Sequence, residues 1–113
     1  MPPLFCSAFM QMLNAIVNGE FNVKSQQVSV PLGLKSIGWS VRLAMILRNR
    51  RAEGIHLYWV DYAGNPVLYG YIPPGGGFRQ LTFGTHPWLI TTTSGDLITV
   101  IIPGTANVDL TIE

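Results

Sequence analysis

Charged residues are scarce in this sequence, and its net charge is small. Only 12% of its 113 residues are Asp, Glu, Lys or Arg, compared with ~25% in typical soluble domains, whereas 48% are hydrophobic. This composition excludes an intrinsically disordered chain and a coiled coil, and the length suits one domain. The net charge of +1 is too small for the electrostatic attraction that non-specific nucleic-acid binding needs, so we expect no nucleic-acid partner.

Cysteine and long apolar segments are also scarce. Cys6 is the only cysteine, so the chain can form no internal disulfide and no thiolate metal site. No apolar stretch reaches the ~18 residues of a transmembrane helix, and no Lys or Arg flanks the apolar N-terminal segment as membrane-surface binding would favour. We therefore expect a cytoplasmic protein with no membrane partner. Secretion is the alternative, because residues 1–19 resemble the hydrophobic region of a signal peptide in composition.

The N-terminal segment carries a helical pattern. Apolar residues recur at helix spacing between residues 3 and 18, with Ser7, Gln11 and Asn14 on the opposite face. Asn18 and Gly19 form a stop signal. Because the polar face has no charge, we expect this amphipathic helix to pack on its own domain or to pair two chains as a homodimer. The domain division is thus 1–26, helix and connection, and 27–113, β-domain.

Short β-branched and aromatic runs, cut by Gly, Pro and Asn, follow in the rest of the chain. The predicted strands are Val28–Val30, Val41–Arg48, Ile55–Tyr62, Val67–Tyr71, Phe78–Phe83, Trp88–Thr92, Leu97–Ile102 and Val108–Ile112. This pattern is typical of a small antiparallel β-sandwich or barrel, and eight runs suggest two sheets. The expected fold class is therefore mainly β, an antiparallel β-sandwich with an N-terminal α-helix.

Alternation within the predicted strand Ile55–Tyr62 assigns its side chains to two faces. One face holds His56, Tyr58, Val60 and Tyr62, and the other holds Ile55, Leu57, Trp59 and Asp61. The second face is apolar except for its last member. We expect that carboxylate to lie at the rim of the sheet.

A hydroxyl, an imidazole and an indole gather near another strand end. Thr82 precedes His86 by four residues with Gly84 between them, and Trp88 follows His86 by two. If the strand begins early, His86 and Trp88 point to the same face. The pattern predicts a small polar site walled by aromatic rings, with a surface threonine and a partly buried histidine as the alternative.

Several short motifs occur in a specific order. They are Leu34-Lys35-Ser36-Ile37, Asn49-Arg50, Trp59-x-Asp61-Tyr62-x-Gly64-x-Pro66, Tyr69, Pro73-Pro74-Gly75-x-Gly77, Arg79 and His86-x-Trp88-Leu89. Across Leu34–Ile90 they resemble, with no gap, the β-domain of the von Hippel-Lindau tumour suppressor. That domain is the substrate-reading half of a ubiquitin-ligase receptor.

The resemblance implies a β-sandwich that binds 4-hydroxyproline in a peptide of a protein partner, which in that family is the α-subunit of the hypoxia-inducible factor. Trp59, Tyr69 and Trp88 fall on the family's aromatic wall, and His86 falls on its histidine. Thr82 stands where the family has serine. Threonine keeps the hydroxyl and adds a methyl group that narrows the pocket.

The sequence also departs from the family pattern. Leu81 and Phe83 stand where the family has histidine and tyrosine beside the bound peptide. Gly38 and Ser40 stand where it has asparagine and arginine in the same groove. We therefore expect recognition of a different flanking sequence. The chain stops at Glu113 with no helical second domain to dock Elongin C, so we expect no such partner and no ubiquitin-ligase role.

Hydroxyproline differs from proline by one oxygen, and an apolar pocket discriminates poorly against an added hydroxyl. If Thr82 and His86 both bond to the hydroxyl, a prolyl ligand leaves each unpaired at a cost of about 1–3 kcal/mol. Together these costs correspond to a preference of roughly 10² to 10⁴. The sequence therefore predicts a non-enzymatic hydroxyproline-binding module that needs no cofactor.

Catalysis and metal binding are weaker alternatives. Thr82, His86 and Asp61 could act as nucleophile, base and orienting carboxylate of a hydrolase. No Gly-rich nucleophile elbow precedes Thr82, and nothing signals an oxyanion hole. His56 and His86 alone are too few ligands for a closed metal site.

Two binding alternatives stay open. A structural or interaction domain could use the same aromatic walls for a carbohydrate, because tryptophan and tyrosine rings also suit sugar faces. The cluster Arg48-Asn49-Arg50-Arg51 could contact an acidic partner, although such charges are usually solvated.

Overall fold

Two β-sheets make up the part of the chain that the computed structural model describes, residues 28–38 and 40–113. The strands are β1 (Arg42–Asn49), β2 (Ile55–Val60), β3 (Pro66–Ile72), β4 (Gly77–Phe83), β5 (Trp88–Thr92), β6 (Leu97–Ile101) and β7 (Val108–Ile112). The prediction of a mainly β fold with two sheets is confirmed. The predicted helix at residues 3–18, and the homodimer that depends on it, lie outside the described residues.

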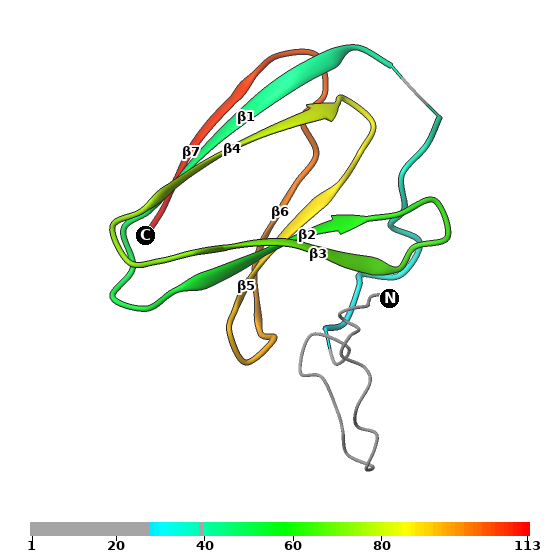
Figure 1. The fold of residues 1–113 in the computed structure, drawn as a ribbon. Helices are drawn as coiled ribbons and strands as arrows, with labels where there is room; N and C mark the ends of the chain where they lie inside the picture. The colour runs from blue at the N-terminus through cyan, green and yellow to red at the C-terminus, as the bar shows by residue number, and fades with distance from the viewer. Residues whose placement is uncertain (1–27, 39) are drawn as a thin grey trace.

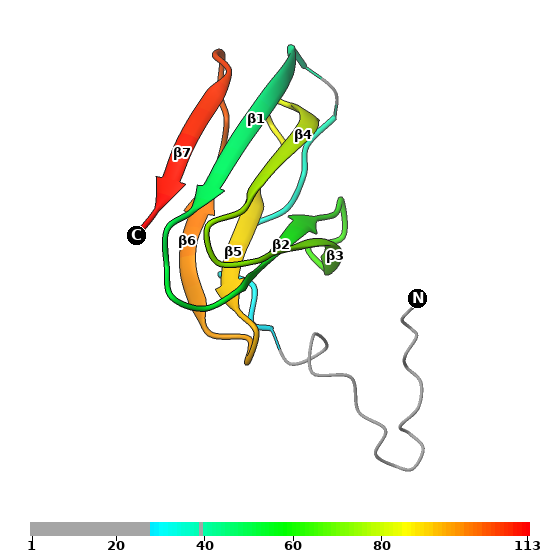
Figure 2. The same ribbon diagram turned by 60° about the vertical axis from the view of Figure 1, so that its left-hand side comes forward.

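The sheets form two layers with the core between them (Figure 1, Figure 2). One has the strand order β4-β1-β7 and the other β3-β2-β5-β6. The larger core cluster draws on both layers and consists of Met45, Leu47, Ile55, Leu57, Ile72, Trp88, Ile90, Ile101 and Ile112. Because every strand sends alternate side chains into this space, burial of the apolar face holds the two layers together.

One strand pair departs from the prediction of a wholly antiparallel fold. Strand β7 pairs parallel to β1, with Met45 opposite Val108 and Asn49 opposite Ile112. The connection after β6 crosses from the four-stranded sheet to the free side of β1, and the side from which it enters sets the direction of β7. Alternation of side chains encodes which face is buried and says nothing about strand direction.

The predicted strand bounds agree with the structure to within one or two residues, with one exception. Residues 28–30 form no strand, so that prediction is wrong. Pro31 follows directly and has no N–H to give to a ladder. Val28 is nevertheless buried, in a second cluster with Tyr58, Val60 and Leu89 on the outer face of the larger sheet.

A buried amide joins the two layers at the end of β1. The Nδ2 atom of Asn49 donates to the carbonyl oxygens of Glu53 at 2.9 Å and of Ile72 at 3.0 Å. Its Oδ1 accepts from the backbone N–H of Arg51 at 2.9 Å. These bonds tie the β1–β2 connection to the end of β3, where the glycine-rich loop crosses to β4. Asn49 thus has a structural role.

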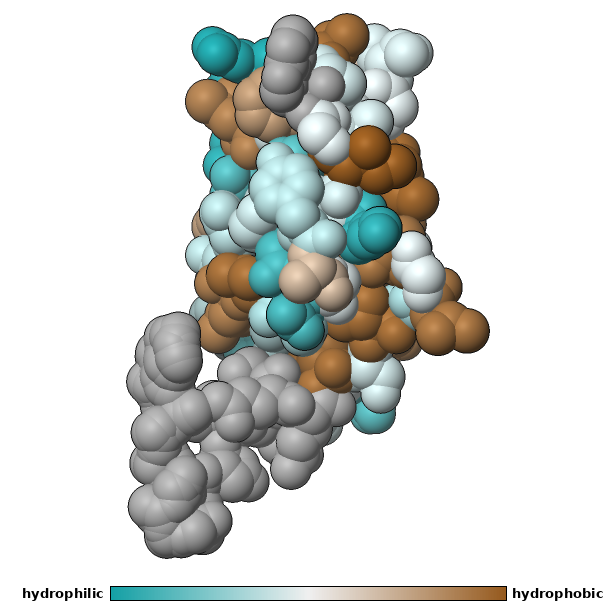
Figure 3. Space-filling model, turned by 90° about the vertical axis from the view of Figure 1, so that its right-hand side faces the viewer, coloured by the Kyte–Doolittle hydropathy of each residue, from teal (hydrophilic) through white to brown (hydrophobic). Residues whose placement is uncertain are grey.

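Apolar side chains on the surface are scattered. Figure 3 shows hydrophobic patches separated by hydrophilic ones on the face at the right-hand side of Figure 1. Scattered exposure of this kind is normal for soluble domains and marks no interface by itself. Among residues 28–38 and 40–113, no helix has the length and apolar character needed to cross a bilayer.

Candidate functional site

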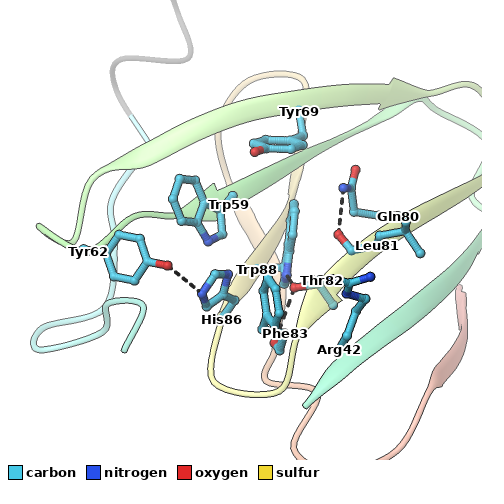
Figure 4. Close-up of a pocket in the computed structure, with 10 residues that line it drawn as sticks. All are labelled: Arg42, Trp59, Tyr62, Tyr69, Gln80, Leu81, Thr82, Phe83, His86 and Trp88. Atoms are coloured by element: carbon cyan, nitrogen blue, oxygen red, sulfur yellow. Dashed lines mark hydrogen bonds between the residues drawn. The ribbon is translucent and has the colours of Figure 1, made fainter. Parts of the chain in front are cut away.

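A cavity of about 300 Å³ is lined by residues from both sheets, including their edge strands β3 and β4 (Figure 4). All five residues predicted to bind a ligand line it, namely Trp59, Tyr69, Thr82, His86 and Trp88. The structure therefore brings together residues that lie on four strands and one loop. Whether they bind a ligand remains a prediction.

Three aromatic rings form the walls of this cavity. Trp59 on β2 and Trp88 on β5 are direct cross-strand partners, so both indoles point toward the space between the sheets. The ring of Tyr69 meets Trp88 edge-on at a centroid distance of 5.0 Å and Trp59 at 6.2 Å. Trp88 is buried whereas Tyr69 is 46% exposed, so the indole lies at the base and the phenol at the mouth.

The Trp59 indole is held in place by a buried serine. Its Nε1–H donates to the hydroxyl of Ser36 at 2.8 Å, and that hydroxyl donates to the carbonyl oxygen of Val60 at 2.6 Å. The polar atom of Trp59 is thus satisfied within the protein. Its ring is left to make apolar and stacking contacts in the cavity.

The hydroxyl of Thr82 is hydrogen-bonded to the indole of Trp88. The Nε1–H of Trp88 donates to Thr82 Oγ1 at 2.8 Å, and both side chains are buried. Oγ1 of Thr82 donates its own proton to the carbonyl oxygen of Phe83. The two oxygens are 3.4 Å apart, which is long for an O–H···O bond. This proton can therefore turn to a better acceptor when one enters the cavity.

His86 sits among aromatic rings at the opposite side of the cavity. Its ring lies 5.6 Å from Trp59 and 5.2 Å from Phe83 between centroids. Its Nε2 atom is 3.0 Å from the hydroxyl of Tyr62. Only 7% of His86 is exposed, and this burial lowers its pKa below the ordinary value of 6.5. The neutral form of the imidazole therefore predominates at pH 7.

The backbone of the β4–β5 connection fixes the position of His86. The N–H of His86 donates to the Phe83 carbonyl at 3.0 Å, which closes a tight turn. The Pro87 carbonyl accepts from the N–H of Val60 at 3.0 Å, which anchors the turn to β2. The imidazole is thus carried by a turn that is bonded at both ends.

The pKa of His56 is also lowered by burial, so both histidines link stability to pH. The unfolded chain binds protons at a higher pH than the folded chain does. The free energy of unfolding is therefore constant above about pH 6.5 and falls below it, with a slope of at most about 1.4 kcal/mol per pH unit for each histidine. Urea denaturation from about pH 7.5 to about pH 5.5 measures this slope.

A matched variant separates the two histidines in that experiment. In His56→Gln the remaining histidine slope belongs to His86, because the sequence has two histidines and the exchanged one does not line the cavity. Stability that rises as the pH falls through this range would contradict the predicted direction of both pKa shifts.

Tyr62 is a cavity residue that sequence reasoning placed on the wrong face. The strand β2 ends at Val60, and Asp61 accepts the backbone N–H groups of Ala63 at 2.9 Å and Asn65 at 2.8 Å. This turn directs Tyr62 to the cavity side of the sheet, where the centroid of its ring lies 5.6 Å from that of Trp59. The signal was present, because the turn residues that follow Tyr62 shorten the strand.

Other lining residues were also missed. Arg42 and Gln80 border the cavity, and neither was predicted to do so. Leu81 and Phe83, which the resemblance assigned to the peptide groove, also line it. This lining is more apolar than the histidine and tyrosine of the family pattern, and recognition of a different flanking sequence stays a prediction.

The imagined hydrolytic arrangement does not form. Asp61 is engaged in its turn, Thr82 is bonded to Trp88, and the hydrogen bond of the His86 side chain goes to Tyr62. His56 packs against Tyr58 and Tyr71 and lies outside the cavity lining. In the described part of the chain, no three His, Cys, Asp or Glu residues are grouped so that they could hold a metal ion.

The arginine cluster is divided among separate contacts. Arg48 forms an exposed ion pair with Asp109, and Arg51 donates to the carbonyl oxygen of Glu113 at 3.3 Å. Arg50 is exposed. Exposed ion pairs contribute little to stability, and this arrangement offers an acidic partner only part of the predicted charge.

The fold and the cavity define a class of protein, a β-sandwich domain with an aromatic pocket at the edges of its sheets. The family model for the VHL beta domain matches residues 34–100, which is more than half of the chain and includes every residue that lines the cavity. The chain therefore belongs to the VHL beta domain family, a family of non-enzymatic substrate-recognition domains. A search of curated proteins found no match to this sequence.

Proposed function

We propose that this protein binds 4-hydroxyproline in a peptide segment of a protein partner. The observation that carries the proposal is that Thr82 and His86, both nearly buried, line the same aromatic cavity. A buried hydroxyl and a neutral imidazole beside indole rings suit a ligand that is apolar except for one hydroxyl.

The size and position of the cavity favour a side chain of an extended peptide as the ligand. About 300 Å³ lies at the lower end of small-molecule pockets. A prolyl ring is a small rigid group that three aromatic faces can enclose. The cavity opens beside Tyr69 and Leu81, which are exposed and lie on edge strands, so the flanking residues of a peptide have room to leave it.

The polar atoms explain how one oxygen decides the affinity. Thr82 Oγ1 accepts from Trp88 and keeps a proton that is free to turn, while His86 is neutral. A hydroxylated ring gives both groups a partner as water leaves. An unmodified ring removes the water and replaces none of its hydrogen bonds, which costs about 1–3 kcal/mol for each group.

Isothermal titration with matched peptides tests this proposal. A set of short peptides of varied flanking sequence carries (4R)-hydroxyproline, (4S)-hydroxyproline or proline at the central position. We expect the (4R) form to bind roughly 10² times more tightly than proline, with the (4S) epimer close to proline, because its oxygen leaves the opposite ring face. Equal affinities, or binding to a glycan array without any hydroxyproline preference, would refute the proposal.

A further inference from the structure

Tyr62 closes one side of the cavity with a polar tip. Its ring packs edge-on against Trp59 at 5.6 Å and against His86 at 5.4 Å between centroids. The side chain is 53% exposed, and its hydroxyl is 3.0 Å from Nε2 of His86 (Figure 4). One ring contact and one hydrogen bond thus join Tyr62 to the imidazole of His86, and a second ring contact joins Tyr62 to Trp59.

The chemistry of the two partners sets the direction of that hydrogen bond. A neutral imidazole has one N–H donor and one nitrogen acceptor. A phenol is a good donor and a weaker acceptor, because its ring withdraws electron density from the oxygen. This chemistry favours the arrangement in which the hydroxyl of Tyr62 donates to Nε2 and the imidazole proton lies on Nδ1.

The other imidazole nitrogen is available to a ligand. No hydrogen bond to Nδ1 of His86 occurs among the described residues, and this atom is not one of the fully buried polar atoms that lack a partner. Nδ1 is therefore in contact with solvent. With the proton on it, the atom is a donor, as is the hydroxyl of Thr82 on the other side.

We propose that Tyr62 is a positioning residue that fixes the Nδ1–H form of His86, so that the pocket presents two donors to one acceptor oxygen on the ligand ring. The statement about the ligand rests on the proposed function, whereas the statement about the imidazole does not. The preferred ligand is then a proline ring that bears an acceptor at C4. A ketone oxygen at that position fulfils this requirement as a hydroxyl does.

Nitrogen-15 NMR of the full chain without ligand tests the imidazole directly. At about pH 7.5, where His86 is neutral, we expect the signals of the Nδ1–H form. In Tyr62→Phe, which keeps both ring contacts, we expect a shift toward the Nε2–H form. The control Tyr71→Phe removes the hydroxyl of a tyrosine whose ring lies against His56, outside the cavity, and should leave the His86 signals unchanged. An Nε2–H form in the unaltered protein, or an unchanged spectrum in Tyr62→Phe, would overturn the assignment.

Peptides with proline, (4R)-hydroxyproline or 4-oxoproline at the centre test the consequence for the ligand. The ketone can only accept, so we expect it to bind about tenfold more tightly than proline, and Tyr62→Phe to remove about threefold to tenfold of that advantage. The affinity for proline should change less than about twofold, since the ring contacts remain.

The outcomes separate the two proposals. If hydroxyproline is preferred but 4-oxoproline binds only as well as proline, His86 accepts from the ligand and the positioning role is wrong, while the proposed function stands. If hydroxyproline and proline bind equally, the proposed function fails, and the NMR spectra alone uphold or refute the role of Tyr62.

Discussion

Replacing Thr82 by valine is expected to abolish most of the preference for hydroxyproline while leaving the weaker binding of proline nearly intact. Valine has almost the same shape as threonine but no hydroxyl. The ligand oxygen then loses the partner that Thr82 Oγ1 would give it, and the affinity for hydroxyproline falls about 10-fold to 100-fold. The affinity for proline should not fall, because the walls formed by Trp59 and Tyr69 are unchanged and a prolyl ring no longer leaves a Thr82 hydroxyl unpaired.

The same substitution has a cost in the unbound protein. Thr82 Oγ1 accepts the Nε1–H of Trp88 at 2.8 Å, and Trp88 is only 2% exposed. Valine leaves this buried N–H without a partner, so we expect the free energy of unfolding to fall by about 1–3 kcal/mol. Chemical denaturation must therefore accompany the titration, to show that the tested protein is folded.

Thr82→Ser is the matched control for both measurements. Serine keeps the acceptor for Trp88 and the donor for the ligand, and it loses only a methyl group. It should retain the hydroxyproline preference to within about tenfold and the stability to within about 1 kcal/mol. A valine variant that still prefers hydroxyproline as strongly as the serine variant would show that Thr82 does not contact the ligand oxygen.

The strands could be predicted from sequence because the signals that define them are local. Alternation within Ile55–Val60 correctly assigns Ile55 and Leu57 to the main core and Tyr58 and Val60 to the opposite face. Gly, Pro and Asn mark the turns. The parallel pairing of β1 and β7 depends instead on where a connection crosses between sheets, and no residue of either strand records that.

Part of the cavity lining could be predicted from sequence, but its hydrogen bonds could not. The resemblance located five lining residues by order and spacing alone. It could not show that Thr82 is hydrogen-bonded to Trp88 or that Tyr62 is hydrogen-bonded to His86, because each bond depends on how a turn orients one side chain. Alternation even placed Tyr62 on the wrong face, since the pattern was carried two residues beyond the true end of β2.

The turn that carries His86 requires a residue without a side chain at Gly84. A Cβ atom there would lie 1.9 Å from the carbonyl oxygen of Gly104 and 3.0 Å from its carbon. The two residues are also bonded, since the N–H of Gly104 donates to the Gly84 carbonyl at 2.9 Å, and the N–H of Gly84 donates to Val41 at 3.0 Å. Three segments of backbone thus meet at this point, and none of them can give way as a flexible side chain could.

Gly84→Ala is therefore expected to be strongly destabilising. Forcing one methyl group into a packed site typically costs about 1–3 kcal/mol, and here the atom it meets is backbone, so we expect at least the upper end of that range. For a domain of this size such a loss lowers the midpoint of thermal unfolding by about 10 °C or more. The displaced turn should also weaken hydroxyproline binding, because His86 lies only two residues further along.

Gly38→Ala is the control for that substitution. A Cβ atom at Gly38 meets nothing within 4 Å, and Gly38 is exposed with no positive φ, so the change should stay within about 0.5 kcal/mol of the parent. Thermal and urea unfolding of the two variants side by side measure the difference. Equal midpoints would mean that the β4–β5 turn and the connection after β6 do not approach each other as closely as the structure has them, and the anchoring of His86 would need another explanation.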